Sequence, residues 1–137
     1  KDFKSGARAN PIMAGQVAGL NEQQMADISA YFASQSVTIG QAKKELVELG
    51  EQLFRAGNQE KGIPACMACH GPAGKGMAGA GFPALGGQHA DYTKAQLNAF
   101  SAETRTNDGE TRIMRDIARR MHNEEIEAVS SYIQGLN

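Results

Sequence analysis

The pentapeptide Cys66-Met67-Ala68-Cys69-His70 constrains this chain more than any other part of its sequence. Two thiols three positions apart, followed at once by an imidazole, form the attachment signature of a c-type haem. On one helical turn both cysteines can add to the vinyl groups of a porphyrin, and the histidine then lies beneath the iron as its proximal ligand. The motif predicts a covalent haem held by Cys66, Cys69 and His70.

Three other interpretations of the motif compete with haem attachment. A thioredoxin-like dithiol needs a preceding strand in a βαβ unit, and the sequence indicates none. A zinc site needs four ligands, and His89 and His122 do not form a second ligand pair. A structural disulfide leaves His70 without a role. Because haem is attached to such sites in oxidising compartments, we expect a periplasmic or equivalent location.

The composition limits the remaining function classes. The net charge of −1 argues against nucleic acid as a partner. No apolar run is long enough to span a bilayer, and no signal peptide is recognisable, so we expect a mature or partial chain. With no tryptophan and only 6% aromatic residues, much of the core has to come from the macrocycle itself.

An internal repeat divides the chain. Three residues of the opening segment recur 97 positions later, and after a short insertion the offset becomes 101, where Met13 aligns with Met114. The three early pairs are Phe3 with Phe100, Arg8 with Arg105, and Asn10 with Asn107. At the later offset Ser29 and Tyr31 align with Ser130 and Tyr132. The same block of sequence therefore occurs twice in the chain.

The second copy of the repeat carries the haem motif, whereas the first copy has only the shared block. We predict two units: residues 1–38 as the incomplete end of a first domain plus a linker, and residues 39–137 as a complete haem-binding domain. On this interpretation the chain starts inside a domain, and the first haem motif precedes Lys1. The alternative is a short protein with an unrelated pair of N-terminal helices.

The pattern of apolar residues predicts an all-α fold, because no stretch alternates with a period of two. Asn21 and Gln24 have the spacing of a capping box that opens the next helix. Gly50 lies on the apolar face of a helix over 41–55 and suggests a close helix crossing. Residues 71–87 are too rich in Gly, Ala and Pro for a regular element. Further helices are expected around residues 65–70, 92–100, 111–121 and 123–134.

The sixth position of the iron separates electron transfer from ligand chemistry, because a thioether there raises the reduction potential. Met114 is the favoured distal ligand, since methionine recurs at this place of the repeat and 44 residues separate it from His70. Met121 is the runner-up, although it aligns with Leu20 and this favours a core role. His89 and His122 are rival ligands, but a lone polar histidine is usually solvated.

The proximal imidazole also needs an acceptor for its second nitrogen. The backbone carbonyl of Pro83 is the candidate, because proline stiffens its loop. The choice of Pro83 over its neighbours in 81–85 stays open at this point.

Four features together resemble the cytochrome c4 family: the Cys-x-x-Cys-His motif, the Gly-Phe-Pro-Ala-Leu-Gly-Gly-Gln-His run at 81–89, the Arg-Thr-Asn-Asp run at 105–108, and the Met114 block. The resemblance implies class I cytochrome c domains in tandem, each with His/Met ligation. Residues 41–137 resemble the whole C-terminal domain, and residues 1–35 resemble the end of the N-terminal domain. Met13 would then be the distal ligand of a first haem, wherever that haem is present.

The same resemblance implies a function. It predicts a periplasmic carrier, often associated with the inner membrane, that passes single electrons from the quinol-oxidising bc complex to a terminal oxidase. In the family pattern the loop proline bonds the proximal histidine, which favours Pro83. This sequence departs from the family pattern in one respect: it lacks the first Cys-x-x-Cys-His motif. Binding of a haem near Met13 and electron transfer between two haems both depend on that motif.

Two alternatives to a carrier differ from it in class. One is a haem subunit of a redox enzyme with an openable distal site, and the other is a haem-dependent interaction module. We predict the carrier rather than an enzyme. The Gly- and Ala-rich segment 71–81 is expected to cover one haem edge thinly, so that a redox partner can approach.

Overall fold

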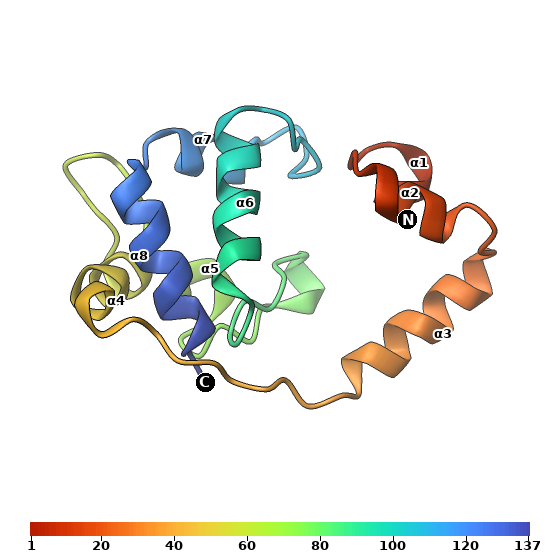
Figure 1. The fold of residues 1–137 in the computed structure, drawn as a ribbon. Coiled ribbons are helices and arrows are strands. Elements are labelled where there is room, and N and C mark those ends of the chain that lie inside the picture. The colour runs from red at the N-terminus through yellow and green to blue at the C-terminus, as the bar shows by residue number, and fades with distance from the viewer.

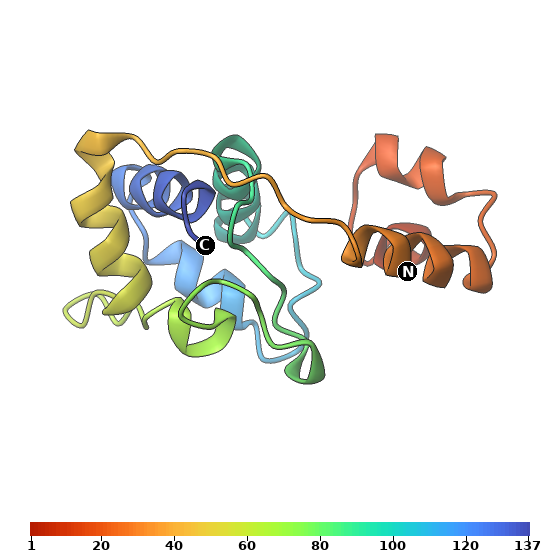
Figure 2. The same cartoon turned by 90° about the horizontal axis from the view of Figure 1, so that it is seen from below.

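The computed structural model describes all 137 residues, and it is built of helices and connecting loops. It contains no strand, only isolated bridges between Asn58 and Ile63 and between Met77 and Phe82. The predicted all-α class is therefore confirmed. Two bodies joined by an extended segment are visible in both orientations (Figure 1, Figure 2).

The N-terminal body consists of three helices: α1 (Asp2–Ser5), α2 (Pro11–Val17) and α3 (Glu22–Ala33). The predicted capping box opens α3, since Asn21 accepts the Gln24 N–H at 2.9 Å and the Gln24 side chain accepts the Asn21 N–H at 2.9 Å. None of the three helices has a buried residue. This body therefore has no core of its own among the described residues.

The segment after α3 runs along the second body. The Gly40 N–H donates to the carbonyl of Gln134 at 3.0 Å, and the Lys43 N–H donates to the Ser131 hydroxyl at 2.8 Å. These bonds hold residues 40–43 in an extended conformation against the second body, and Lys43 has φ −68° and ψ 125°, so the helix predicted over 41–55 starts later. The chain instead makes a 3-10 turn at Lys44–Leu46, and α4 spans Val47–Arg55.

The α4 helix packs against the last helix, α8 (Asn123–Gln134), whose bounds match the predicted ones. A Cβ on Gly50 would lie 2.4 Å from the carbonyl oxygen of Ala128 and 2.7 Å from the Tyr132 Cβ. Real side chains do not approach that closely, so glycine permits the crossing. The close helix approach expected at Gly50 is confirmed.

The second body is completed by α5 (Met67–His70), a 3-10 turn at Ala78–Ala80, α6 (Ala90–Ser101) and α7 (Ile113–Arg119). The α6 helix packs against both α7 and α8. Eight buried apolar residues form the core, with Cys66 and Met67 packed against it. The core residues are Leu53, Phe54, Ile63, Met121, Ile126, Val129, Ile133 and Leu136. The haem motif therefore lies at the edge of the core.

Residues related by the repeat meet where the two bodies touch. The guanidinium groups of Arg8 and Arg105 both donate to the Gln96 side-chain oxygen, at 2.8 and 3.0 Å. Each arginine also lies over a phenylalanine of its own copy, Phe3 at 4.6 Å and Phe100 at 4.4 Å from the ring centroid. The two copies thus present the same local structure to each other. The division at residues 38 and 39 remains a prediction.

No helix of this structure has both the length and the apolar character that crossing a bilayer requires.

Candidate haem-attachment site

The two cysteines and the histidine lie on one turn of helix. Cys66 is the N-cap of α5, and its carbonyl accepts the N–H groups of Cys69 at 3.3 Å and of His70 at 2.9 Å. Neither cysteine is in a disulfide, both residues are of intermediate burial, and the imidazole is buried. This is the arrangement in which both cysteines can reach one face of a macrocycle.

The imidazole of His70 is held by the loop that follows it. Its Nδ1 lies 2.8 Å from the carbonyl oxygen of Pro83. Because a carbonyl oxygen only accepts, Nδ1 carries the proton, and the lone pair of Nε2 is left for a metal. Metal-bound histidines are commonly oriented by such a bond. The contact expected for Pro83 is present, and its role in haem binding remains a prediction.

Glycine allows the loop to reach the histidine. Gly76 has φ of +75°, and a Cβ there would lie 2.6 Å from the Ala84 nitrogen and 2.7 Å from the Pro83 carbonyl carbon. Met77 and Phe82 exchange backbone hydrogen bonds of 2.8 and 3.1 Å across the turn. Contrary to the expectation of an irregular loop throughout, Ala78–Ala80 forms a 3-10 turn inside this closed segment. The loop therefore folds back and presents the Pro83 carbonyl.

The environment of Cys66 disfavours the competing thiolate chemistries. Burial raises the pKa of the Cys66 thiol to about 11, so the thiol stays protonated at neutral pH. Thiolates are the nucleophiles of dithiol redox centres and the ligands of zinc. No cluster of three His, Cys, Asp or Glu residues lies close enough together to hold a metal ion. Both alternatives lose support from these observations.

Met114 is the second residue of α7, and it is half-buried. An open hollow of about 600 Å³ separates α7 from the segment that leads into Cys66. Its lining comes from residues 59–64 on one side and 111–120 on the other: Gln59, Gly62, Ile63, Pro64, Thr111, Ile113, Asp116, Ile117 and Arg120. The element that carries Met114 therefore faces the segment that leads into the attachment turn.

The rival ligands are placed differently. Met121 is buried in the core cluster, and Met77 is exposed. His89 is the exposed N-cap residue of α6, and His122 lies 3.2 Å from the Lys61 ammonium group at the start of α8. These placements favour Met114 over the others, although its ligand role remains a prediction.

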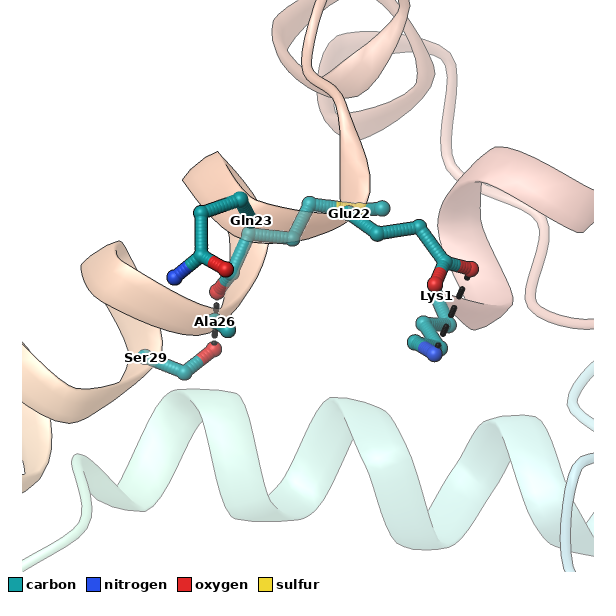
Figure 3. A pocket seen from close by; sticks show the side chains of 6 residues that line it. Lys1, Glu22, Gln23, Ala26 and Ser29 are labelled. Atoms are coloured by element: carbon teal, nitrogen blue, oxygen red, sulfur yellow. Dashed lines mark hydrogen bonds and ion pairs between the residues drawn. The ribbon is translucent and has the colours of Figure 1, made fainter.

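Met13 lies apart from the other candidate ligands, in α2 of the N-terminal body, and is 36% exposed. The same body has a hollow of about 340 Å³ lined by Lys1 and the first turns of α3, including Met25 (Figure 3). Lys1 pairs with Glu22 at 3.4 Å across it. In the second copy the equivalent of Met25 is Ile126, a core residue. All three histidines lie in the second body, so the body that carries Met13 contains no histidine.

Sequence reasoning missed a buried ion pair beside Met114. The Arg115 Nε lies 2.7 Å from Asp108 Oδ1, and both side chains are almost fully buried. Burial alone would raise the pKa of Asp108, but hydrogen bonds from the backbone and side chain of Arg115 outweigh it and lower the pKa. The partners lie seven positions apart, but Asp108 is in a loop and Arg115 in α7, so the periodicity of a single element does not pair them. Their only signal is the proximity of each to a motif.

The donor set suits a c-type haem better than a bare metal ion. It combines two thiols at the attachment spacing, one imidazole with a free Nε2, and the thioether of Met114 on α7 of the same body. Sulfur and imidazole as axial ligands are those of cytochromes c. Cys66, Cys69 and His70 would hold the group, and Met114 would close its far side.

The fold and this turn define a class of protein, and comparison with known proteins agrees. The cytochrome c family model matches residues 47–137, so the chain belongs to the cytochrome c family, with one covalent haem c at its two cysteines. Cytochrome c4 of Pseudomonas aeruginosa is 53% identical over 99% of this chain and 68% of that protein. The expected resemblance to cytochrome c4 is thereby confirmed.

Two further relatives refine the comparison. The crystal structure of reduced recombinant cytochrome c4 from Pseudomonas stutzeri superposes with a TM-score of 0.96, at 48% identity, over 99% of this chain and 76% of that chain. This confirms the class I cytochrome c fold. The thiosulfate dehydrogenase electron acceptor of Stutzerimonas stutzeri strain A1501 is 46% identical over 96% of this chain. The chain spans only 61% of that relative's length.

Proposed function

We propose that this chain is a periplasmic single-electron carrier that takes electrons from a quinol-oxidising bc complex and delivers them to a terminal oxidase. Cys66 and Cys69 hold the haem through thioether bonds, His70 is the proximal ligand and Met114 the distal one. The haem supplies an iron that alternates between ferric and ferrous states. Peripheral association with the inner membrane belongs to the same proposal.

The observation that carries the proposal is the buried His70 held by Pro83. The hydrogen bond of 2.8 Å locks the imidazole in one tautomer and one orientation. The rest of the loop is held closed by two features: the close approach of Gly76 to residues 82–84, and the backbone bridge between Met77 and Phe82. A carrier benefits from such rigidity, because the chain then rearranges little when the charge at its centre changes.

A second candidate donor has a specific observation behind it. The 46% identity to a thiosulfate dehydrogenase electron acceptor favours a role in accepting electrons from a thiosulfate-oxidising enzyme. This changes the donor and leaves the carrier chemistry unchanged. Mixing the oxidised protein with each purified donor and following haem reduction by absorbance distinguishes the two, and faster reduction identifies the donor.

Carbon monoxide tests whether the distal position is closed. We expect the reduced, haem-loaded protein to bind carbon monoxide slowly or not at all, because a thioether has to leave first. Met114→Ala opens the position and should bind rapidly. Met121→Ala is the matched control: it removes a core methionine and should lower stability without opening the iron.

The outcomes separate the function classes. Rapid, complete binding by the unmodified protein would favour the haem subunit of an enzyme with an openable site. Rapid binding only after Met121→Ala would transfer the ligand role to Met121. Intact mass measured on the same sample counts the covalent haems, and a second haem would bring Met13 into the ligand set.

A further inference from the structure

We propose that the buried Asp108–Arg115 ion pair is the device that positions Met114 and thereby sets how readily the distal side of the haem opens. The inference rests on the proposed function, because it takes Met114 as the distal ligand. Asp108 and Arg115 are positioning residues, which act on the iron only through the methionine.

Three hydrogen bonds join Arg115 to the loop before α7. Its backbone N–H donates to Asp108 Oδ2 at 3.0 Å, its Nε donates to Asp108 Oδ1 at 2.7 Å, and its Nη2 donates to the Gly109 carbonyl at 2.8 Å. The backbone amide of Arg115 belongs to the peptide plane that follows Met114. Fixing this amide therefore fixes the backbone from which the thioether extends.

The start of α7 has no side-chain cap from its own N-cap residue. Its N-cap is Arg112, which has a φ of +53° and makes no capping hydrogen bond with its side chain. Non-glycine residues rarely adopt that conformation, and it persists only where surrounding contacts impose it. The helix has seven residues, too few to be stable alone. Asp108 supplies the missing cap from outside, by accepting the N–H of the third helical residue.

The first copy of the repeat holds its methionine in another way. Asn10 is the N-cap of α2 and accepts the Met13 N–H directly at 2.9 Å, with Pro11 at the first helical position. At the repeat offsets Pro11 aligns with Asp108, and Ala14 aligns with Arg115. The ion pair therefore accompanies the four-residue insertion and exists only in the second copy.

An exposed ion pair in the same loop provides a control. Glu103 accepts from Arg112 at 2.7 Å and also contacts Arg119, and the Glu103 and Arg112 side chains are 38% exposed. Solvent screens such pairs, and they contribute little to stability. In contrast, when Asp108 is neutralised, the buried Arg115 guanidinium loses its counter-charge but keeps its desolvation cost. The two pairs brace the same loop and differ in burial.

The test uses the haem-loaded full chain and the variants Asp108→Asn and Glu103→Gln. Two readouts report methionine ligation: the far-red charge-transfer band of sulfur-ligated ferric haem, and the apparent affinity for cyanide, which binds only after the methionine leaves. The apparent affinity scales with the fraction of molecules whose site is open. We expect Asp108→Asn to weaken the band and raise cyanide affinity about tenfold or more, and Glu103→Gln to change it less than about twofold.

Each outcome has a distinct meaning. An unmodified protein without the band contradicts methionine ligation, and with it the proposed function. A band present in the unmodified protein, with both the band and the cyanide affinity unchanged in Asp108→Asn, contradicts the inference alone. If Asp108→Asn does not acquire haem, Arg115→Gln breaks the pair from the other side, and a raised cyanide affinity supports the inference. Failure of both variants to load while Glu103→Gln loads would assign the pair to folding and overturn it.

Discussion

The two copies of the repeat have related sequences but different degrees of burial. Ile133 in α8 is 2% exposed, whereas Phe32, at the equivalent position of α3, is 68% exposed. Val129 and Ile28 differ in the same way, at 1% and 43%. The second copy has α4 packed on this face through Gly50, whereas α3 has no buried residue and no helix packed closely on it. An apolar helix face thus becomes core only when a partner helix closes over it.

The copies also solve one capping problem differently. In both, a helix carries a methionine near its start and needs an acceptor for its first N–H groups. The first copy uses the side chain of Asn10, adjacent in sequence, whereas the second uses Asp108 across an inserted loop. The inserted loop adds a buried charge to the second copy. Its methionine is consequently held by tertiary contacts as well as by local ones.

Core truncation should give the largest difference between the copies. Ile133→Ala removes buried methyl and methylene groups and should lower the free energy of unfolding by about 2–5 kcal/mol. Phe32→Ala, its partner in the repeat, should change it by less than about 0.5 kcal/mol. Urea unfolding followed by circular dichroism measures both. Equal losses would show that another segment covers α3.

Glycine substitution sharpens the same contrast. Gly50→Ala places a methyl group against the Ala128 carbonyl and should cost about 1–3 kcal/mol through the forced separation of α4 and α8. Gly15→Ala in α2 meets nothing within 4 Å and should be neutral or stabilising by up to about 1 kcal/mol. Thermal unfolding of the two variants gives the signs. A harmless Gly50→Ala would refute the tight crossing.

Acid should affect the second copy through Glu125. Burial would raise the pKa of Glu125, but hydrogen bonds from the His122 N–H at 2.8 Å, from Lys61 and from Asn58 outweigh it and lower the pKa. A lowered folded-state pKa stabilises the fold fully above the unfolded value of about 4.3, and this is lost as the pH falls through the folded value. Glu125→Gln should cost roughly 1–3 kcal/mol at neutral pH and flatten the decline below about pH 4.

Unfolding titrations between about pH 3 and 7 compare Glu125→Gln with the unmodified chain. Glu22→Gln, in the exposed pair with Lys1 of the first copy, is the matched control and should leave the pH profile unchanged. If the free energy of unfolding falls with the same slope below about pH 4 in all three proteins, the role of Glu125 is contradicted.

The smallest effect is expected where the copies touch. Arg8→Ala removes an exposed hydrogen bond to Tyr92 at 2.6 Å and a partly buried one to Gln96 at 2.8 Å. The global free energy of unfolding should fall by less than about 1 kcal/mol. Amide exchange should accelerate in α1 and α2 and stay unchanged in α4 and α8. Acceleration spread through both bodies would mean that the copies unfold as one unit.

Local patterns in the sequence predicted much of the fold. The capping box at Asn21 and the bounds of α8 follow from side chains close to one another along the chain. The Gly50 crossing also follows, because a glycine on an apolar helix face has few other uses. The start of α4 was misplaced, because the Gly40 and Lys43 N–H groups bond to α8 and hold this segment extended. No local pattern in the sequence indicates a partner about 90 residues away.

The candidate site divides in the same way. Cys66, Cys69 and His70 are recognisable because the macrocycle dictates their spacing. Pro83 was recognisable only in part, since its contact depends on how the loop closes around Gly76. The Asp108–Arg115 pair was not recognisable, because its geometry depends on the left-handed residue Arg112 and on an insertion. The sequence pattern therefore does not predict contacts that depend on how a loop folds back onto the rest of the protein.

The hydrogen atom that Gly76 carries in place of a side chain has a consequence for engineering. A methyl group at position 76 would push the backbone of residues 82–84 outward. The Pro83 oxygen would then move away from the imidazole. His70 would then be free to turn about its Cβ–Cγ bond, and haem maturation would have to proceed with an unaligned ligand. Position 76 should therefore stay glycine when the exposed tip of this loop is redesigned for new redox partners.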